Sequence, residues 1–398
     1  MTTTPDEIRL ARVALGCLVE PGDRELGLLV RRVGPVDGLC RVLSGDGVPD
    51  RLRDLARLRL RAGTADADVD VAWTLARALL ATADRAGARA VTPEDDEWPP
   101  QLDDLARISN PNTSLPVDRN TDPPQVLWVR GEIRLDEAAE RSVAVVGARA
   151  ASSYGTHLTT DLAYGLADRG WTVVSGGAYG IDAAAHRAAL SAGGLTVAIL
   201  ASGVDRPYPL GHANLFDRIA ETGLLVSEWP FGSAPHRVRF LVRNRVIAAL
   251  TRGTVVVEAA SRSGSRQTLG RARRLGRRAM AVPGPVTSAT SVGCHAELRT
   301  EGTRLVTTFQ EILEEVGRIG DDLAPVDRGP HRPHDTLDPV SAQLLDAVLP
   351  RRARTAEEIA AVAGLTGRDA RRTLPMLVNA GFVEEHGDGY RLRAARRR

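Results

Sequence analysis

Two glycine-rich segments, each following an apolar run rich in β-branched residues, could bind phosphate. The first run, VAVVGAR, places Gly147 and Arg149 at the end of an expected strand. Glycines let backbone amides approach an anion closely, and a helix N-terminus favours negative charge. The second run, VVSGGAYGID, supplies small residues and one acid at the start of an expected helix: Ser175, Gly176, Gly177, Gly180 and Asp182. The two segments together predict a phosphate-binding site.

Catalysis is not indicated at these segments. Asp182 and His186 are four residues apart, so they share one face of a helix. A helix cap and a satisfied polar residue explain this pair better than an acid–base pair. We find no nucleophile, general base or metal-ligand spacing, and we therefore predict neither catalytic nor metal-binding residues.

A second group of candidate phosphate ligands follows in two blocks, HRVRFLVRNR and VVVEAASRSGSR. Arginine can grip phosphate with two parallel hydrogen bonds, and hydroxyls at a helix start can add to this. Glu258, the acid at the end of a strand, is interpreted as an organiser of these arginines. The residues predicted from the two blocks are Arg237, Arg239, Arg243, Asn244, Arg245, Glu258, Ser263, Gly264, Ser265 and Arg266.

The charge distribution is uneven along the chain. The net charge is +2, yet residues 237–278 hold twelve arginines and one acid, Glu258. All 52 basic residues are arginine, which excludes a Walker A lysine and a Schiff-base lysine. The segment predicts a continuous basic surface and a polyanionic partner.

Composition excludes several other classes of protein. With 43% hydrophobic residues in 398, the chain is large enough for two or three domains. The start, MTTTPDEIRL, lacks the features of a signal peptide, and no run has the length of a membrane span, so we expect a cytoplasmic protein. The three cysteines show no CxxC spacing, and no cofactor is expected.

Strand-like and helical runs alternate from residue 125 to residue 318. Near-continuous apolar strands separated by helices are typical of βαβ units in a parallel sheet covered on both faces. The prediction is an α/β fold, a Rossmann-like, doubly wound parallel sheet. A Pro- and Asp-rich linker, residues 91–124, precedes it.

The flanking regions predict two smaller domains. Residues 1–90 show helical periodicity without convincing strands, and VRRVGPVDGLCRVL resembles a helix-hairpin or SAM-like module, with a plain helical packing domain as the alternative. Residues 319–336 form a proline-rich linker that we expect to be flexible. Residues 337–398 predict three helices and a hairpin, the winged-helix pattern, with Thr355 and Thr366 as helix caps.

The ordered blocks of residues 125–318 resemble one family, the DprA/Smf DNA-processing proteins. The resemblance rests on VGAR, SGGAYGIDAAAHRAAL, RNRVIAAL, VVEAASRSGS and GRRAMAVPG with a following SVG. Arg266-Gln267 and His295 stand where the family usually has an apolar pair and an asparagine. The resemblance implies a non-catalytic protein that binds single-stranded DNA, forms a homodimer through its Rossmann-like domain and helps to load the recombinase RecA during transformation or recombination.

Two other functions remain open from the sequence. One is a nucleoside-monophosphate phosphohydrolase of the Rossmann type, in which Glu258 and Arg149 act on a ribose-phosphate bond. The other is a transcription regulator whose winged helix binds duplex DNA through Arg368, Arg371 and Arg372. The density of arginine is high for one small nucleotide, and acids in the expected wing oppose duplex binding.

Overall fold

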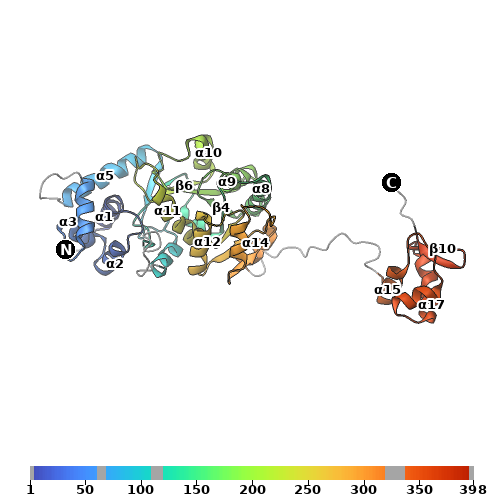
Figure 1. Cartoon of the computed structure of the whole chain (residues 1–398). Helices are drawn as coiled ribbons and strands as arrows, with labels where there is room; N and C mark the ends of the chain where they lie inside the picture. Colours follow the sequence, from blue (N-terminus) through green and yellow to red (C-terminus); the bar gives the residue numbers. More distant parts are fainter. Residues whose placement is uncertain (1–3, 61–68, 109–119, 319–336, 394–398) are drawn as a thin grey trace. The chain divides into compact units, whose positions relative to one another are not determined.

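A computed structural model describes residues 4–60, 69–108, 120–318 and 337–393 (Figure 1). The contacts divide the chain into two compact units, residues 1–324 and 325–398. The predicted linker 319–336 and part of the linker 91–124 lie outside the described residues. No helix in the described ranges is long and apolar enough to span a bilayer.

The first unit is built on a nine-stranded sheet in the order β1-β2-β6-β5-β4-β3-β7-β8-β9. Seven strands, β3 to β9, pair in parallel, whereas β2 is antiparallel to β6 and β1 is antiparallel to β2. The strands are β1 Ala88–Val91, β2 Leu127–Arg130, β3 Ser142–Val146, β4 Thr172–Ser175, β5 Thr196–Leu200, β6 Leu224–Ser227, β7 Gly253–Val256, β8 Arg278–Ala281 and β9 Thr303–Leu305. The predicted mixed α/β fold with a large parallel sheet is confirmed.

Helices cover both faces of the sheet, because alternate residues of each strand point to opposite sides. Val143 and Val145 pack with α8, α9 and α14, while Ala144 and Val146 pack with α7, α11 and α12. From β2 to β9, the helices that lie between strands are α7 Leu135–Glu140, α8 Ser153–Asp168, α9 Ile181–Ser191, η2 Leu210–His212, α10 Ala213–Thr222, α11 Arg237–Leu250, α12 Gly264–Arg274 and α13 Val292–Leu298. The last helix of the unit, α14 Phe309–Val316, follows β9.

The direction of winding reverses between β3 and β7. The chain moves outward from β3 through β4, β5 and β6, and α11 then returns it to β7, which pairs with the other side of β3. In open parallel sheets a crevice forms at this reversal, beyond the carboxyl ends of the strands. The topology therefore places the loops after β3 and β7 around one crevice.

The N-terminal helices pack directly on the sheet domain. α1 Pro5–Leu18, α2 Arg24–Val33, α3 Pro35–Ser44, α4 Asp50–Leu60 and α5 Val69–Arg85 share a core with residues of α10 and β5. The expected helix–turn–helix at Gly34-Pro35 is present, with Gly34 at a φ of 83°. The expectation of no strand in residues 1–90 is wrong, because β1 begins at Ala88 and pairs with β2, and η1 Pro100–Arg107 lies in the predicted linker.

Residues 337–393, the described part of the second unit, contain three helices and one hairpin. These elements are α15 Pro339–Ala347, α16 Ala356–Ala363, α17 Gly367–Asn379, β10 Val383–His386 and β11 Gly389–Leu392. Thr355 forms a capping box with Glu358 at α16, and Thr366 caps α17, as predicted. Gly387 turns the hairpin with a φ of 61°.

Candidate nucleic-acid interface

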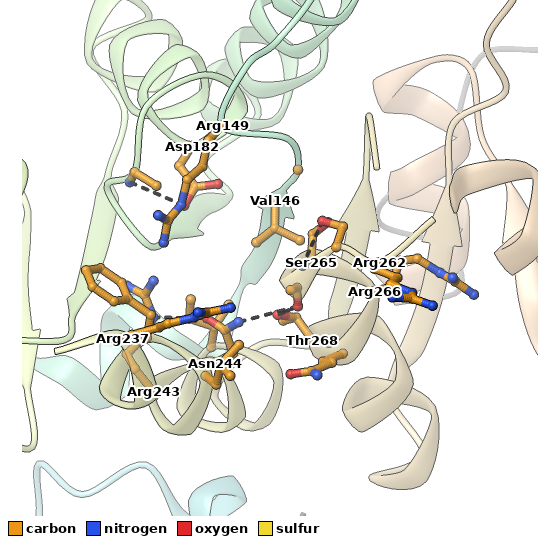
Figure 2. A pocket seen from close by; sticks show the side chains of 18 of the residues that line it. Val146, Arg149, Asp182, Arg237, Arg243, Asn244, Arg262, Ser265, Arg266 and Thr268 are labelled. Carbon is orange, nitrogen blue, oxygen red and sulfur yellow. Dashed lines mark hydrogen bonds between the residues drawn. The ribbon is translucent and has the colours of Figure 1, made fainter. Parts of the chain in front are cut away.

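A crevice with a volume of about 1040 Å³ opens where the winding reverses. Its walls come from the loops after β3, β4 and β7 and from α11 and α12, and Figure 2 shows Arg149 and Asp182 facing α11 across it. Ten of the predicted site residues line it: Gly147, Arg149, Asp182, Arg237, Arg243, Asn244, Ser263, Gly264, Ser265 and Arg266. The structure therefore brings together residues from segments that lie more than a hundred positions apart.

Arg149 is an exposed cation on the wall of the crevice. Its guanidinium carbon lies 5.0 Å from the centre of the Phe240 ring, a cation–π contact that leaves the hydrogen-bond donors of the guanidinium available. Two residues earlier, position 147 requires glycine, since a β-carbon there would lie 2.6 Å from Cγ1 of Ile181. Arg149 forms no ion pair with any of the described residues.

The loop between β4 and α9 folds around its own carboxylate. Gly176 and Ala178 donate their backbone N–H groups to Oδ2 of Asp182, at 3.2 and 3.4 Å. Gly180 adopts a φ of 80°, which favours glycine. The prediction that these amides cradle a bound phosphate needs correction, because Asp182 already accepts two of them. Burial raises the pKa of Asp182, and the positive charge of Arg243 opposes that shift.

Arg243 lies beneath the crevice and is 4% exposed. Its Nη1 donates to the carbonyl of Gly176 at 2.9 Å, and its Nε donates to Oδ1 of Asn244 at 3.1 Å. Burial lowers its pKa to about 10, so the guanidinium stays charged at neutral pH. Asn244 in turn donates to the carbonyl of Gly264 at 3.4 Å, which links α11 to the start of α12.

Most arginines of residues 237–278 do not form the continuous basic surface that the sequence predicts. Backbone carbonyls accept hydrogen bonds from several of them, including Arg243, Arg252, Arg271 and Arg274. Six form ion pairs with acids distant in sequence: Arg239 with Glu20, Arg245 with Glu228, Arg266 and Arg273 with Glu297, Arg277 with Asp104, and Arg278 with Glu315. The acids offset much of the charge.

Arg237 and Arg262 are the remaining two of the twelve. Both are exposed, both line the crevice, and neither forms an ion pair within the described part of the chain. With Arg149 they make three available cations on the crevice walls, here called the free arginines. Figure 2 shows Arg262 and Arg266 at the opposite end of the crevice from Arg237.

The serines after β7 form a helix N-terminus at the crevice. Ser263 caps α12 by accepting from the backbone N–H of Ser265 at 3.3 Å, and the two hydroxyl oxygens lie 2.7 Å apart. α12 carries no acid in its first turn. Because the first amides of a helix carry partial positive charge, this end of the crevice also favours an anion.

Glu258 organises loops and does not organise arginines as the sequence interpretation assumed. Its carboxylate is 1% exposed and accepts from the backbone N–H of Ser152 at 2.9 Å, from the Ser152 hydroxyl at 2.6 Å and from the Thr290 hydroxyl at 2.7 Å. Ser152 is the N-cap of α8, so the carboxylate lies at the positive end of that helix. Glu258 thereby fixes the loop that carries Arg149.

Eight predicted residues do not line the crevice: Ser175, Gly176, Gly177, Gly180, His186, Arg239, Arg245 and Glu258. Ser175 is fully buried and donates its hydroxyl to the carbonyl of Val145 at 2.7 Å. Arg245 is fully buried against Glu228, 2.6 Å away. Burial excludes direct contact with a ligand for Ser175 and Arg245, which instead hold the walls of the crevice.

His186 is likewise internal. It is fully buried with Nδ1 2.7 Å from Oγ1 of Thr196, which itself donates to Val173, so the ring nitrogen is the donor. Burial lowers the pKa of His186 to about 3, and Arg243 adds to that shift.

Acid should therefore destabilise the protein through His186. The unfolded imidazole binds a proton near pH 6.5 and the native one only near pH 3, so the free energy of unfolding falls as pH drops through that window. We expect His186→Leu to show a shallower loss between pH 6.5 and pH 3, measured by urea unfolding. His157→Gln, which changes an exposed histidine, should keep the wild-type dependence; equal slopes in all three proteins would contradict the assignment.

Some crevice residues escaped the sequence analysis. Arg262 lies inside the predicted SRSGS block and could have been found there, because a loop arginine beside small residues has no local acid. Tyr208 and Glu297 had no local signal. They reach the crevice only because the β5–α10 loop and α13 fold toward it.

The family model for DNA recombination-mediator protein A matches residues 89–317, more than half of the chain. The chain belongs to the DNA recombination-mediator protein A family. This confirms the DprA/Smf resemblance. The matched residues span all nine strands except the first residue of β1, so the family's region and the sheet domain coincide.

Individual members of this family are similar to the chain in sequence and in structure. The putative DNA processing protein DprA of Mycobacterium tuberculosis is 46% identical over 94% of this chain and 90% of its own length. Protein Smf of Escherichia coli is 36% identical over 62% of this chain and 76% of its own. The X-ray structure of DprA from Streptococcus pneumoniae is 30% identical, covers 80% of this chain and all of that one, and has a TM-score of 0.59.

Proposed function

We propose that this protein binds single-stranded DNA in the crevice and acts as a non-catalytic mediator of recombination, helping to load RecA. The observation that carries the proposal is the set of free arginines, Arg149, Arg237 and Arg262, on the walls of one crevice. Uncompensated cations around a concave site favour a polyanion. The family and the names of its members supply the nature of that polyanion.

A single strand suits this site better than a duplex. The charged floor at Arg243 lies inside a crevice rather than on an open face. Duplex DNA is stiff, with a persistence length of about 150 base pairs, and does not bend into such a site cheaply. A single strand can turn its backbone toward the arginines and expose its bases.

The arrangement of acids favours holding over turnover. Glu258, which a phosphohydrolase would use on the ribose-phosphate bond, already accepts three hydrogen bonds and does not line the crevice. Asp182 accepts two backbone amides, and Glu297 is paired with two arginines. In the described part of the chain the crevice offers no unengaged carboxylate or histidine as a general base.

A salt titration tests the proposal directly. If the crevice neutralises about five phosphates, log K for an oligo-dT strand should fall with log salt at a slope of about −3.5. We expect weaker binding of a duplex of equal length and a shallower slope for Arg149→Ala. Fluorescence anisotropy over a range of salt concentrations provides the measurement. A slope near zero would contradict the proposal. Release of free base from nucleoside monophosphates would support the enzyme instead.

The proposal also gives a domain type or a role to each of the other regions of the chain. The three helices and hairpin of residues 337–398 form a winged-helix-like domain, residues 1–90 a SAM-like domain, and residues 125–318 carry DNA binding and the homodimer contact. In the hairpin, Glu384 pairs with Arg391 at 2.6 Å, and Glu385 and Asp388 add negative charge. Such a hairpin suits protein contact better than duplex DNA.

Removal of the second unit should leave DNA binding intact. Because residues 1–324 form a compact unit that contains the whole crevice, we expect a chain ending at Ala324 to keep the affinity and salt slope of the full chain for single-stranded DNA. The measurement is the same anisotropy titration on both chains. A shallower slope for the shortened chain would place phosphate contacts in the second unit.

A further inference from the structure

Three exposed side chains without charge gather at one rim of the crevice. Leu210 is 81% exposed, Tyr179 is 51% exposed and Tyr208 is 46% exposed. Single exposed apolar residues are common on protein surfaces, whereas neighbouring ones next to a binding site mark a contact surface. We call these three residues the apolar shelf.

The shelf is continuous with the crevice. Tyr208 lines the crevice, and its ring lies 5.9 Å from that of Phe240, the ring that Arg149 covers. Tyr179 directly follows Ala178, another lining residue. The Tyr179 hydroxyl lies so close to Gly211 that a β-carbon there would be 2.6 Å away, which places the tyrosine beside Leu210.

Neighbouring side chains hold the shelf in place. The Tyr179 ring packs edge-on to the buried His212, with ring centres 4.5 Å apart, and His212 packs in turn on Phe216. His212 Nδ1 lies 3.1 Å from the carbonyl of Gly177, within the same loop as Tyr179. An ordered aromatic surface loses little conformational entropy when a flat ligand stacks on it.

We propose that the apolar shelf is a stacking site for nucleobases of the strand whose phosphates lie in the crevice. The inference rests on the proposed function and deepens it. The three free arginines and the uncharged shelf suit different parts of a nucleotide. Phosphates bind to the cations, and bases stack on the aromatic surface. Stacking tolerates every base, so the shelf adds affinity for single strands without adding sequence preference.

The test separates bases from phosphates. The full chain and the variant Tyr179→Ala/Leu210→Ala are titrated with oligo-dT and with an abasic deoxyribose-phosphate strand of equal length. We expect the variant to bind oligo-dT about tenfold more weakly, with an unchanged salt slope, and to bind the abasic strand as the wild type does. Tyr164→Ala is the matched control, because Tyr164 is 45% exposed on α8 and does not line the crevice.

Each other outcome has a distinct meaning. If the variant and the wild type bind oligo-dT equally, or if the variant loses both strands alike, the stacking site is overturned while the charged crevice stands. If the wild type binds neither strand in a salt-dependent way, the proposed function and the shelf are both overturned. Equal thermal unfolding midpoints for the three proteins ensure that the comparison concerns folded chains.

Discussion

Replacing the three free arginines, Arg149, Arg237 and Arg262, by glutamine is expected to lower affinity for single-stranded DNA about 50-fold at 0.15 M salt. Each phosphate contact on a single strand contributes about 0.7 to the slope of log K against log salt, so the triple variant should lose about 2 from it. All three side chains are exposed, and within the described part of the chain only Arg149 among them packs on an aromatic ring, so folding should be unaffected. Anisotropy titrations at four or more salt concentrations measure both quantities.

The matched control removes the same charge elsewhere. Arg32, Arg187 and Arg218 are exposed and do not line the crevice. Their triple replacement by glutamine should leave the slope close to that of the wild type. Equal losses in the two triple variants would mean that the net charge of the protein, and not the crevice, governs binding.

Arg245→Met should unfold the protein far more easily, by about 3–5 kcal/mol, although the sequence suggested a DNA ligand at this position. Arg245 is fully buried and Glu228 is 2% exposed, so removing the arginine leaves a buried carboxylate without its counter-charge. Burial already raises the pKa of Glu228, and Arg245 opposes that shift. Urea unfolding measures the change in free energy.

A double variant distinguishes a lost ion pair from lost packing. Arg245→Met/Glu228→Leu removes both charges, and replacement of a buried pair by apolar residues is often close to neutral. We therefore expect the double variant to recover most of the stability. An Arg245→Met chain of wild-type stability whose salt slope is shallower by about 0.7 would restore the sequence-based role in DNA contact.

The arrangement of strands and helices was largely predictable from local patterns. Apolar runs such as SVAVV and TVAIL, each followed by a helical stretch, are typical of buried parallel strands, and the seven parallel strands lie within residues 125–318, where the alternation predicts the sheet. The edge strand β1 was missed because its four residues, ARAV, follow α5 after only two turn residues, and their strand character depends on pairing with β2.

The loop between β4 and α9 shows which features the local sequence predicts and which it does not. Three glycines before Asp182 correctly predicted a tight loop that opens a helix, since only glycine tolerates the φ of 70° and 80° at Gly177 and Gly180. The sequence did not show which anion accepts hydrogen bonds from the backbone amides of this loop. The nearby Asp182 takes two of them because its own helix returns the carboxylate to the loop.

The sequence by itself determined the family, the α/β sheet with its reversal of winding, and ten of the residues around the crevice. Only the tertiary structure decided which arginines are free. The sequence shows which charged residues are close along the chain, whereas ion pairs form between charged residues that are close in space. Glu20, Glu228 and Glu297 come from other segments and engage arginines that have no local acid, and this leaves Arg149, Arg237 and Arg262 available for the phosphate contacts proposed above.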